Sequence, residues 1–198
     1  MSEYEKVLLT KARKGDANAF EMLIMEHERK AYNIAYRFLK NPEDAEDITQ
    51  EAFLRAFRNI KKFKGQSSFS TWLYRIINNT CIDFVRSKQN KNVDSIDKTI
   101  RYEGEELELQ IPSDENDPVE TVETIEISEL MKSMLDQLPD DQKMALVLRD
   151  IQGFSYQEIV DITGVGMGTV KSRINRGRIA LKELIEQKGE LFSDYIVK

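Results

Sequence analysis

Residues 171–178 carry a run of hydrogen-bonding side chains whose types and spacing suit contact with DNA bases. Arginine and lysine donate to guanine in the major groove of duplex DNA, asparagine pairs with adenine, and serine can contact either base. On a helix these side chains would project away from an apolar stripe, or lie at its edge with long stems extending outward. The residues that we predict to bind duplex DNA are Lys171, Ser172, Arg173, Asn175, Arg176 and Arg178.

Two predicted helices and a glycine turn position this set. The first helix begins after Ser155, which can form a capping box with Glu158, and it ends at Gly164, where a left-handed residue is expected. The second begins near Met167, and its predicted buried stripe comprises Val170, Ile174, Gly177, Leu181 and Leu184. This arrangement predicts a helix-turn-helix. For the second helix alone, an amphipathic surface helix with solvated charges is the alternative.

A second cluster of candidate base-binding residues lies in a helix that we predict to begin near Ser70, the expected N-cap. The cluster comprises Phe69, Trp72, Tyr74, Arg75, Asn78, Asn79 and Arg86. Aromatic rings stack on unstacked bases, and outward arginine and asparagine side chains can hydrogen-bond to base edges. The pattern therefore indicates a site for unpaired bases, and the alternative is that the aromatic rings simply form core.

A stripe of polar side chains lies opposite the apolar face of the helix predicted for residues 42–61, whose start is indicated by Asn41 and Pro42. The stripe consists of Asp47, Gln50, Glu51 and Leu54, at helical steps of three, four and seven. A solvated surface would give this pattern by default. An exposed leucine among polar groups also suits docking on a partner protein.

The residues of common catalytic and metal sites are scarce. Cys81 and His27 are the one cysteine and the one histidine, which excludes a disulfide framework and a cysteine zinc site. We place His27 on a helix surface. Residues 164–168 resemble a dinucleotide-binding glycine pattern, but they follow a predicted helix instead of a strand. The sequence therefore predicts no enzyme, no cofactor and no small-molecule substrate.

The first residues, MSEYEKVLLTKARKGD, are charged from the third position. They contain no apolar run long enough for a secretion signal or a membrane span. We therefore expect a cytoplasmic protein that is not itself in a membrane.

Charge is distributed unevenly along the chain, whose formal net charge is −6. No lysine or arginine occurs from Tyr102 to Met131, a stretch rich in aspartate and glutamate, so the remaining sequence is net basic. Helical periodicity also disappears between Lys88 and Asp117. The predicted fold is all-α, with helical domains at residues 1–88 and 118–188, an acidic flexible linker at 89–117 and a tail at 189–198.

Helical periodicity on both sides of the linker predicts the individual helices and their buried faces. In the first domain we expect helices at about residues 4–14 and 17–39, with Val7 and Leu8 facing inward in the first. In the second domain we expect a helix from about residue 119 to 138. Another helix should begin at Pro139, with Met144, Val147 and Leu148 packed inside.

Two long segments resemble bacterial RNA polymerase sigma factors. Residues 41–86, NPEDAEDITQEAFLRAFRNIKKFKGQSSFSTWLYRIINNTCIDFVR, resemble region 2 of that family. Residues 138–181, LPDDQKMALVLRDIQGFSYQEIVDITGVGMGTVKSRINRGRIAL, resemble region 4. The two-domain layout without further regions is similar to that of the extracytoplasmic-function (ECF) subfamily.

The resemblance implies a subunit that gives core RNA polymerase its promoter specificity and helps to open the start site. The stripe from Asp47 to Leu54 would dock on a coiled coil of the largest polymerase subunit. Asn79 would hold a flipped base of the minus-ten element, with the rest of its cluster nearby. The second domain would bind the minus-thirty-five element as duplex, with Arg149 adding a contact. The linker would run toward the RNA exit channel, and an anti-sigma factor, often membrane-bound, would be a further partner.

A different class of protein also fits part of the pattern. A conventional helix-turn-helix regulator would bind a palindromic duplex site as a dimer without being a polymerase subunit. This alternative leaves the cluster between Trp72 and Asn79 without a role.

Overall fold

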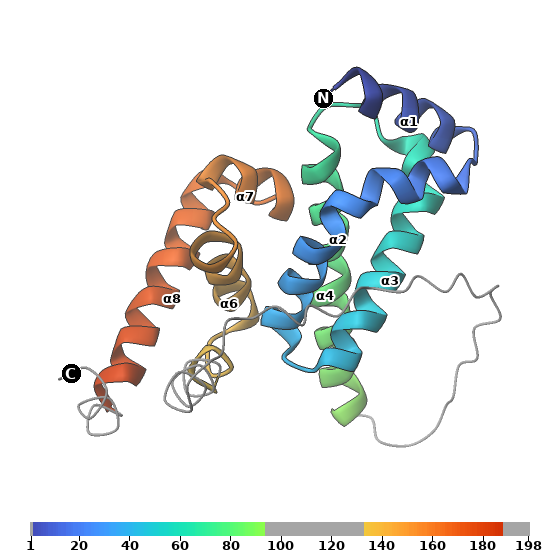
Figure 1. The fold of residues 1–198 in the computed structure, drawn as a ribbon. Helices are drawn as coiled ribbons and strands as arrows, with labels where there is room; N and C mark the ends of the chain where they lie inside the picture. The colour runs from blue at the N-terminus through green and yellow to red at the C-terminus, as the bar shows by residue number, and fades with distance from the viewer. Residues whose placement is uncertain (1, 94–132, 188–198) are drawn as a thin grey trace, which may run out of the picture. The chain divides into compact units, whose positions relative to one another are not determined.

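The chain forms two compact units, Met1–Ser113 and Asp114–Lys198. The computed structural model describes residues 2–93 and 133–187, and within these ranges every regular element is a helix (Figure 1). This confirms the predicted all-α fold. The acidic linker predicted at 89–117 lies outside the described residues except for its first five positions, which are helical.

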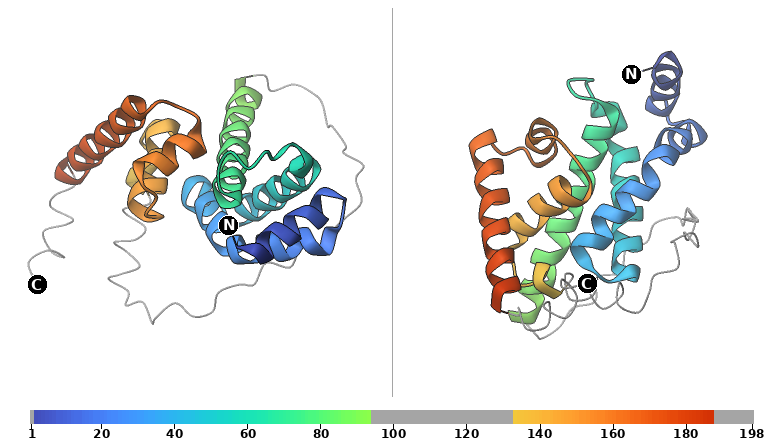
Figure 2. Two further views of the ribbon diagram at one scale, coloured as in Figure 1. Left: turned by 90° about the horizontal axis from the view of Figure 1, so that it is seen from above. Right: turned by 60° about the vertical axis from the view of Figure 1, so that its left-hand side comes forward.

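The first unit is a small helical bundle. Its elements are α1 (Glu3–Arg13), α2 (Ala17–Leu39), α3 (Pro42–Asn59), the 3-10 helix η1 (Ile60–Lys62) and α4 (Phe69–Val93). Helices α2, α3 and α4 pack against one another, and α1 packs on α2 and contacts η1. Figure 2 shows the three long helices side by side, with α1 at one end of this bundle.

Side-chain caps explain where these helices begin. The Asn41 side chain accepts from the Asp44 amide at 2.9 Å, with Pro42 as the first helical residue, which confirms the predicted start of α3. The predicted cap of α4 at Ser70 is wrong by two residues. The Ser68 hydroxyl accepts from the Thr71 amide at 3.1 Å, so the helix begins at Phe69.

The core of the first unit is apolar and largely as expected, with one error in α1. Val7 was predicted to face inward, but it is 52% exposed. Leu8, Leu9 and Ala12 form the buried face instead, since positions i, i+1 and i+4 of a helix share one side. Val7 lies beyond the edge of that face.

The second unit contains α6 (Asp140–Leu146), the π-helical turn η2 (Val147–Ile151), α7 (Tyr156–Thr163) and α8 (Met167–Gln187). Both α6 and α7 pack against α8. Met144, Val147 and Leu148 are buried, as predicted. The helix predicted from residue 119 lies outside the described residues except for its last part, where residues 133–135 are helical.

Gly177 lets α6 and α8 approach each other closely. A β-carbon at this position would lie 3.0 Å from Leu146 Cδ1 and 3.5 Å from Gln142 Cβ. With Val170 and Ile174 it forms the buried part of the predicted stripe, whereas Leu181 and Leu184 are only half-buried. The small residue therefore sets the position of the helix that carries the candidate DNA-binding side chains.

Candidate nucleic-acid interface

Helices α7 and α8 form the predicted helix-turn-helix. The Ser155 amide donates to Glu158 Oε2 at 2.8 Å and the Glu158 amide donates to Ser155 Oγ at 3.2 Å, which confirms the capping box. Gly164 ends α7 in the left-handed region with φ 74°, and α8 begins at Met167. The local chemistry of three residues thus fixes where α7 begins and ends.

The outward face of α8 presents polar side chains that are available to a ligand. Lys171, Asn175 and Arg176 are exposed, and none makes a side-chain hydrogen bond or ion pair with a described residue. Ser172 is half-buried on the same side. Thr169 was not among the predicted residues, and it is exposed one turn before Ser172 and Arg173.

The remaining predicted arginines of this unit are bound to neighbouring groups. Arg173 Nε lies 2.9 Å from Asp141 Oδ2 of α6, and Arg178 Nε donates to Asp150 Oδ2 of η2 at 3.0 Å. The hydrogen bond to Asp150 raises the pKa of Arg178. These ion pairs hold α8 against the preceding helices. That either arginine contacts DNA stays a prediction. Asp141 and Asp150 would compete with DNA phosphate for the two guanidinium groups.

Arg149 braces the loop that leads into the helix-turn-helix. Its Nη1 donates to the Phe154 carbonyl at 2.7 Å, and its guanidinium carbon lies 4.7 Å from the centre of the Tyr156 ring. The side chain is half-buried. Arg149 therefore has a structural role before α7, and its contact with DNA stays a prediction.

In the first unit, the aromatic residues of the second cluster divide between core and surface. Phe69 is fully buried and Tyr74 is only 4% exposed, so the alternative that these rings form core holds for both. Trp72 is half-buried, and its ring centre lies 5.2 Å from that of Phe63 and 5.9 Å from that of Phe69. Trp72 is therefore the cluster's aromatic ring that remains partly open to a base.

The two adjacent asparagines point in different directions. Asn78 was predicted to project outward, but it is only 6% exposed. Its Nδ2 donates to Asn79 Oδ1 at 3.0 Å, and Asn79 itself is exposed. The buried amide therefore orients the exposed one, and the Asn79 Nδ2 makes no hydrogen bond to a described residue.

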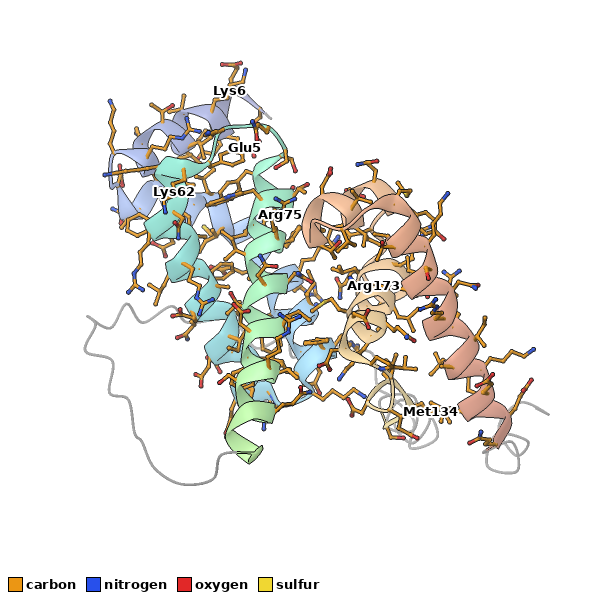
Figure 3. All side chains as sticks on the ribbon, turned by 180° about the vertical axis from the view of Figure 1, so that it is seen from behind. Glu5, Lys6, Lys62, Arg75, Met134 and Arg173 are labelled. Carbon is orange, nitrogen blue, oxygen red and sulfur yellow. The ribbon has the colours of Figure 1, made fainter. Side chains whose placement is uncertain are left out.

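Arg75, Asn79 and Arg86 share one exposed face of α4. They are separated by four and seven residues, which is close to one and two helical turns. Figure 3 shows Arg75 projecting from this helix. Three of the four side chains that were predicted to project outward thus share one surface of α4, and the fourth, Asn78, is buried.

His27 was predicted to be a surface residue of its helix, but it is half-buried against the start of α4. Its Nδ1 lies 3.2 Å from the Tyr74 hydroxyl, and its ring is edge-on to Tyr74 and close to Phe69. Burial lowers the pKa of His27 and raises that of Tyr74 to about 12. A neutral imidazole and a protonated tyrosine therefore share a hydrogen bond at the start of α4, and the His27 tautomer sets which of the two donates.

This pair predicts a loss of stability at mildly acidic pH. The pKa of His27 is depressed from its ordinary value of 6.5, so the unfolded chain binds the proton first as the pH falls. The contribution of neutral His27 to the free energy of unfolding is complete above pH 6.5. It decreases as the pH falls from there through the pKa of His27 in the folded protein. We expect His27→Gln to remove this component, measured as urea midpoints from Trp72 fluorescence above and below pH 6.5. Equal pH dependence in both proteins would contradict the assignment.

The polar stripe predicted on α3 is solvent-accessible along its length. Asp47 is exposed, and Gln50, Glu51 and Leu54 are half-buried. Glu51 pairs with Arg55 Nε at 2.6 Å, and Arg55 Nη1 lies 3.6 Å from Asp83 of α4. The stripe therefore combines the exposed carboxylate of Asp47 with the half-buried apolar side chain of Leu54.

The described residues contain no group of three or more histidine, cysteine, aspartate or glutamate side chains that could hold a metal ion. In the same parts of the chain, no helix has the length and apolar character needed to cross a membrane.

The fold and these surfaces define a two-domain helical protein with a helix-turn-helix DNA-binding unit. Family models described as Sigma-70 region 2 and Sigma-70, region 4 match residues 23–91 and 128–181. The chain is 38% identical to the ECF RNA polymerase sigma factor SigW of Bacillus subtilis over 179 residues, covering 90% of this chain and 95% of that protein. It is 33% identical to the RNA polymerase sigma-H factor of Pseudomonas aeruginosa over 188 residues, covering 93% and 95%.

The fold also matches a solved complex of the sigma factor RpoE with the anti-sigma factor NepR from Bartonella quintana. The TM-score is 0.63 at 24% identity, over 84% of this chain and 96% of that one. The chain belongs to the sigma-70 family of RNA polymerase sigma factors, in its ECF subfamily. It is thus a transcription initiation factor, and nothing in the comparisons supports a dimeric regulator.

Proposed function

We propose that this sigma factor acts in the cytoplasm and divides promoter recognition between its two units. The observation that carries the proposal is that each unit exposes its own set of base-binding side chains, on α8 and on α4. The second unit would dock on duplex DNA, and the first would hold a base of the opened strand. Polymerase would bring both units to one promoter.

Duplex recognition rests on α8. Lys171, Asn175 and Arg176 are exposed and unpaired with described residues, and these residue types can distinguish guanine and adenine in the major groove. Arg173 and Arg178 are already paired with carboxylates, so we assign them first to positioning α8. The minus-thirty-five element is the corresponding DNA segment.

Strand opening rests on α4. Unstacking a base costs a few kcal/mol, and stacking on an aromatic ring with hydrogen bonds to the base edge can offset that cost. Trp72 offers part of a ring, and the free Nδ2 of Asn79 can donate to a base acceptor. Arg75 and Arg86 flank Asn79 on the same face and suit the adjacent phosphates. The minus-ten element is the segment that we expect to be captured.

Core polymerase would bind the stripe on α3. Asp47→Arg reverses an exposed charge at the N-terminal end of that stripe, and Glu46→Arg makes the same change on an adjacent exposed residue outside it. We expect the first variant to bind core polymerase at least about tenfold more weakly, or about 1.4 kcal/mol, and the second to bind normally. A fluorescence titration of labelled core enzyme measures both, and equal affinities would remove the stripe from the interface.

An anti-sigma factor is the further partner that we propose. The structure of similar fold from Bartonella quintana is of a sigma factor in complex with such a protein. A partner of this kind would cover the polymerase- and DNA-binding surfaces of the two units. The function as a whole is tested by transcription in vitro, since core polymerase should initiate at new sites only when this chain is added.

A further inference from the structure

An exposed apolar surface lies on the hairpin formed by α1 and α2, which pack side by side (Figure 1). This α1–α2 patch consists of Tyr4, Val7, Met22 and Met25, which are between 47% and 62% exposed. Tyr4 and Val7 are three residues apart, as are Met22 and Met25, so the members of each pair are neighbours on their helix. The Tyr4 hydroxyl lies 4.0 Å from Met22 Sδ and joins the two pairs. Four of the six exposed large hydrophobic side chains among the described residues thus form one surface.

The patch points away from the α4 surface that we assign to the opened strand. His27 packs against the start of α4, and Met25 precedes it by two residues, or about 200° around α2. Leu23 and Ile24, between the two methionines, are buried in the core. The side of α2 that carries Met22 and Met25 therefore has no packing role within the first unit.

Glutamates surround the middle of the patch. Residues 21–28 include three glutamates and no lysine or arginine, and a glutamate stands on each side of Tyr4 in the sequence. Figure 3 shows one of these, Glu5, on α1. Burial and the negative charge of Glu21 raise the pKa of Glu28, so the electrostatic field along this part of α2 is negative.

The basic side chains of the hairpin leave this acidic middle uncompensated. Lys6 is paired with Glu3. Lys11 and Arg29 each lie one helical turn beyond the patch, after Val7 and Met25. An apolar centre with an acidic border would repel DNA and anionic phospholipid, whereas it is complementary to a cationic protein segment.

Methionine suits the binding of a helix. Its long, unbranched side chain adapts to the shape of the surface that covers it, and methionine-rich surfaces recur where amphipathic helices bind. Such helices bind through apolar residues spaced three and four positions apart, and their other side stays polar. The acidic border of the patch selects lysine or arginine for the positions beside those apolar residues.

We propose that the α1–α2 patch binds a basic amphipathic helix of a partner protein distinct from core polymerase. The apolar side of that helix covers Tyr4, Met22 and Met25. Its lysine or arginine side chains pair with Glu21 and Glu26, which are exposed and have no side-chain partner among the described residues. The proposal goes beyond the function assigned above, because the patch contains no residue of the DNA- or polymerase-binding sets.

The test measures the binding of two fluorescein-labelled helical peptides to the full chain by anisotropy. One peptide carries leucines three and four positions apart with lysine on its other side, and the second replaces every lysine by glutamate. We expect the lysine peptide to bind at least about tenfold more tightly at low salt, with a difference that shrinks as salt is added. Glu21→Gln with Glu26→Gln should weaken its binding about threefold.

A second pair of substitutions tests the apolar contact. Met22→Gln with Met25→Gln keeps side-chain length and helix propensity, and it should weaken the lysine peptide at least about tenfold, because both methionines have exposed surface to bury. The matched control is Ile151→Gln with Ile179→Gln, which changes the two exposed large hydrophobic residues described in the second unit. The control should bind the peptide as the wild type does.

Equal affinities for the two peptides, or an equal loss in the control, would overturn the proposal. Weaker binding of core polymerase by the methionine variant would also overturn it, since the patch would then belong to the polymerase interface. A wild-type dimer in sedimentation that the methionine variant loses would assign the patch to a second copy of the chain instead. Transcription in vitro by the variant holoenzyme should be unchanged, which separates this test from that of the proposed function.

Discussion

Asn79→Ala is expected to reduce promoter opening by about tenfold to a hundredfold, corresponding to about 1–3 kcal/mol for a lost base contact. Asn79 is exposed, its Oδ1 is held by the buried Asn78, and its Nδ2 is directed by that contact. Without the amide, an extruded base would lose a donor that offsets its unstacking. Permanganate reactivity of unpaired thymines measures opening by the holoenzyme, and binding to a duplex minus-thirty-five fragment measures docking, which should be unchanged.

Two other asparagine substitutions separate base capture from folding. Asn18 is exposed on α2 and is not among the predicted base-binding residues, so Asn18→Ala should leave both opening and stability unchanged. Asn78→Ala removes a buried donor and should lower the free energy of unfolding as well as opening. If Asn79→Ala impaired duplex docking as much as opening, the division of roles between the units would be wrong.

The parts of the fold that sequence predicted well depend on chemistry between residues close in the chain. Ser155 and Glu158 are three residues apart, as are Asn41 and Asp44, so each helix start follows from local hydrogen bonds. Gly164 similarly marks a left-handed end that other residues adopt reluctantly. The bounds of α7, and with them the turn before α8, were therefore predictable before any tertiary contact was known.

The wrong predictions of exposed side chains on α2 and α4 have one physical origin, which is how much of a helix its neighbours cover. Helix α4 packs against both α2 and α3, so its buried arc includes Tyr74 and Asn78 beside Leu73 and Ile77. Helical periodicity gives the centre of an apolar face, but the number of partner helices sets its width. His27 was misplaced for the same reason, since residues of α4 cover it.

Long-range charge pairs were also beyond the reach of sequence patterns. Arg178 and Asp150 are 28 residues apart, and nothing in their local sequence indicates that they meet. The same holds for Arg173 and Asp141 on two different helices. A basic helix therefore suggested more free DNA-binding arginines than the structure provides, and the pairs divide the set into positioning and available side chains.

Arg176→Ala is expected to weaken duplex docking by about 1–3 kcal/mol, provided that its guanidinium makes a bidentate contact with guanine. Arg176 is exposed on α8 and makes no side-chain contact that would have to break on binding. Arg178→Ala is the matched comparison, and it should cost less docking energy because Asp150 already occupies that guanidinium. Competition among duplex fragments that differ at single base pairs measures both affinity and specificity.

The salt dependence of docking distinguishes the two contacts that Arg176 can make. A base contact predicts relaxed specificity at one base pair with an unchanged salt slope, whereas a phosphate contact predicts a uniform loss and a slope smaller by about 0.9. We expect the first result, because Arg176 follows Asn175 and lies one turn after Ser172, on the helix surface that we propose enters the groove. A larger loss for Arg178→Ala would instead mean that the Asp150 pair opens on binding, and that the paired arginine, not the free one, contacts DNA.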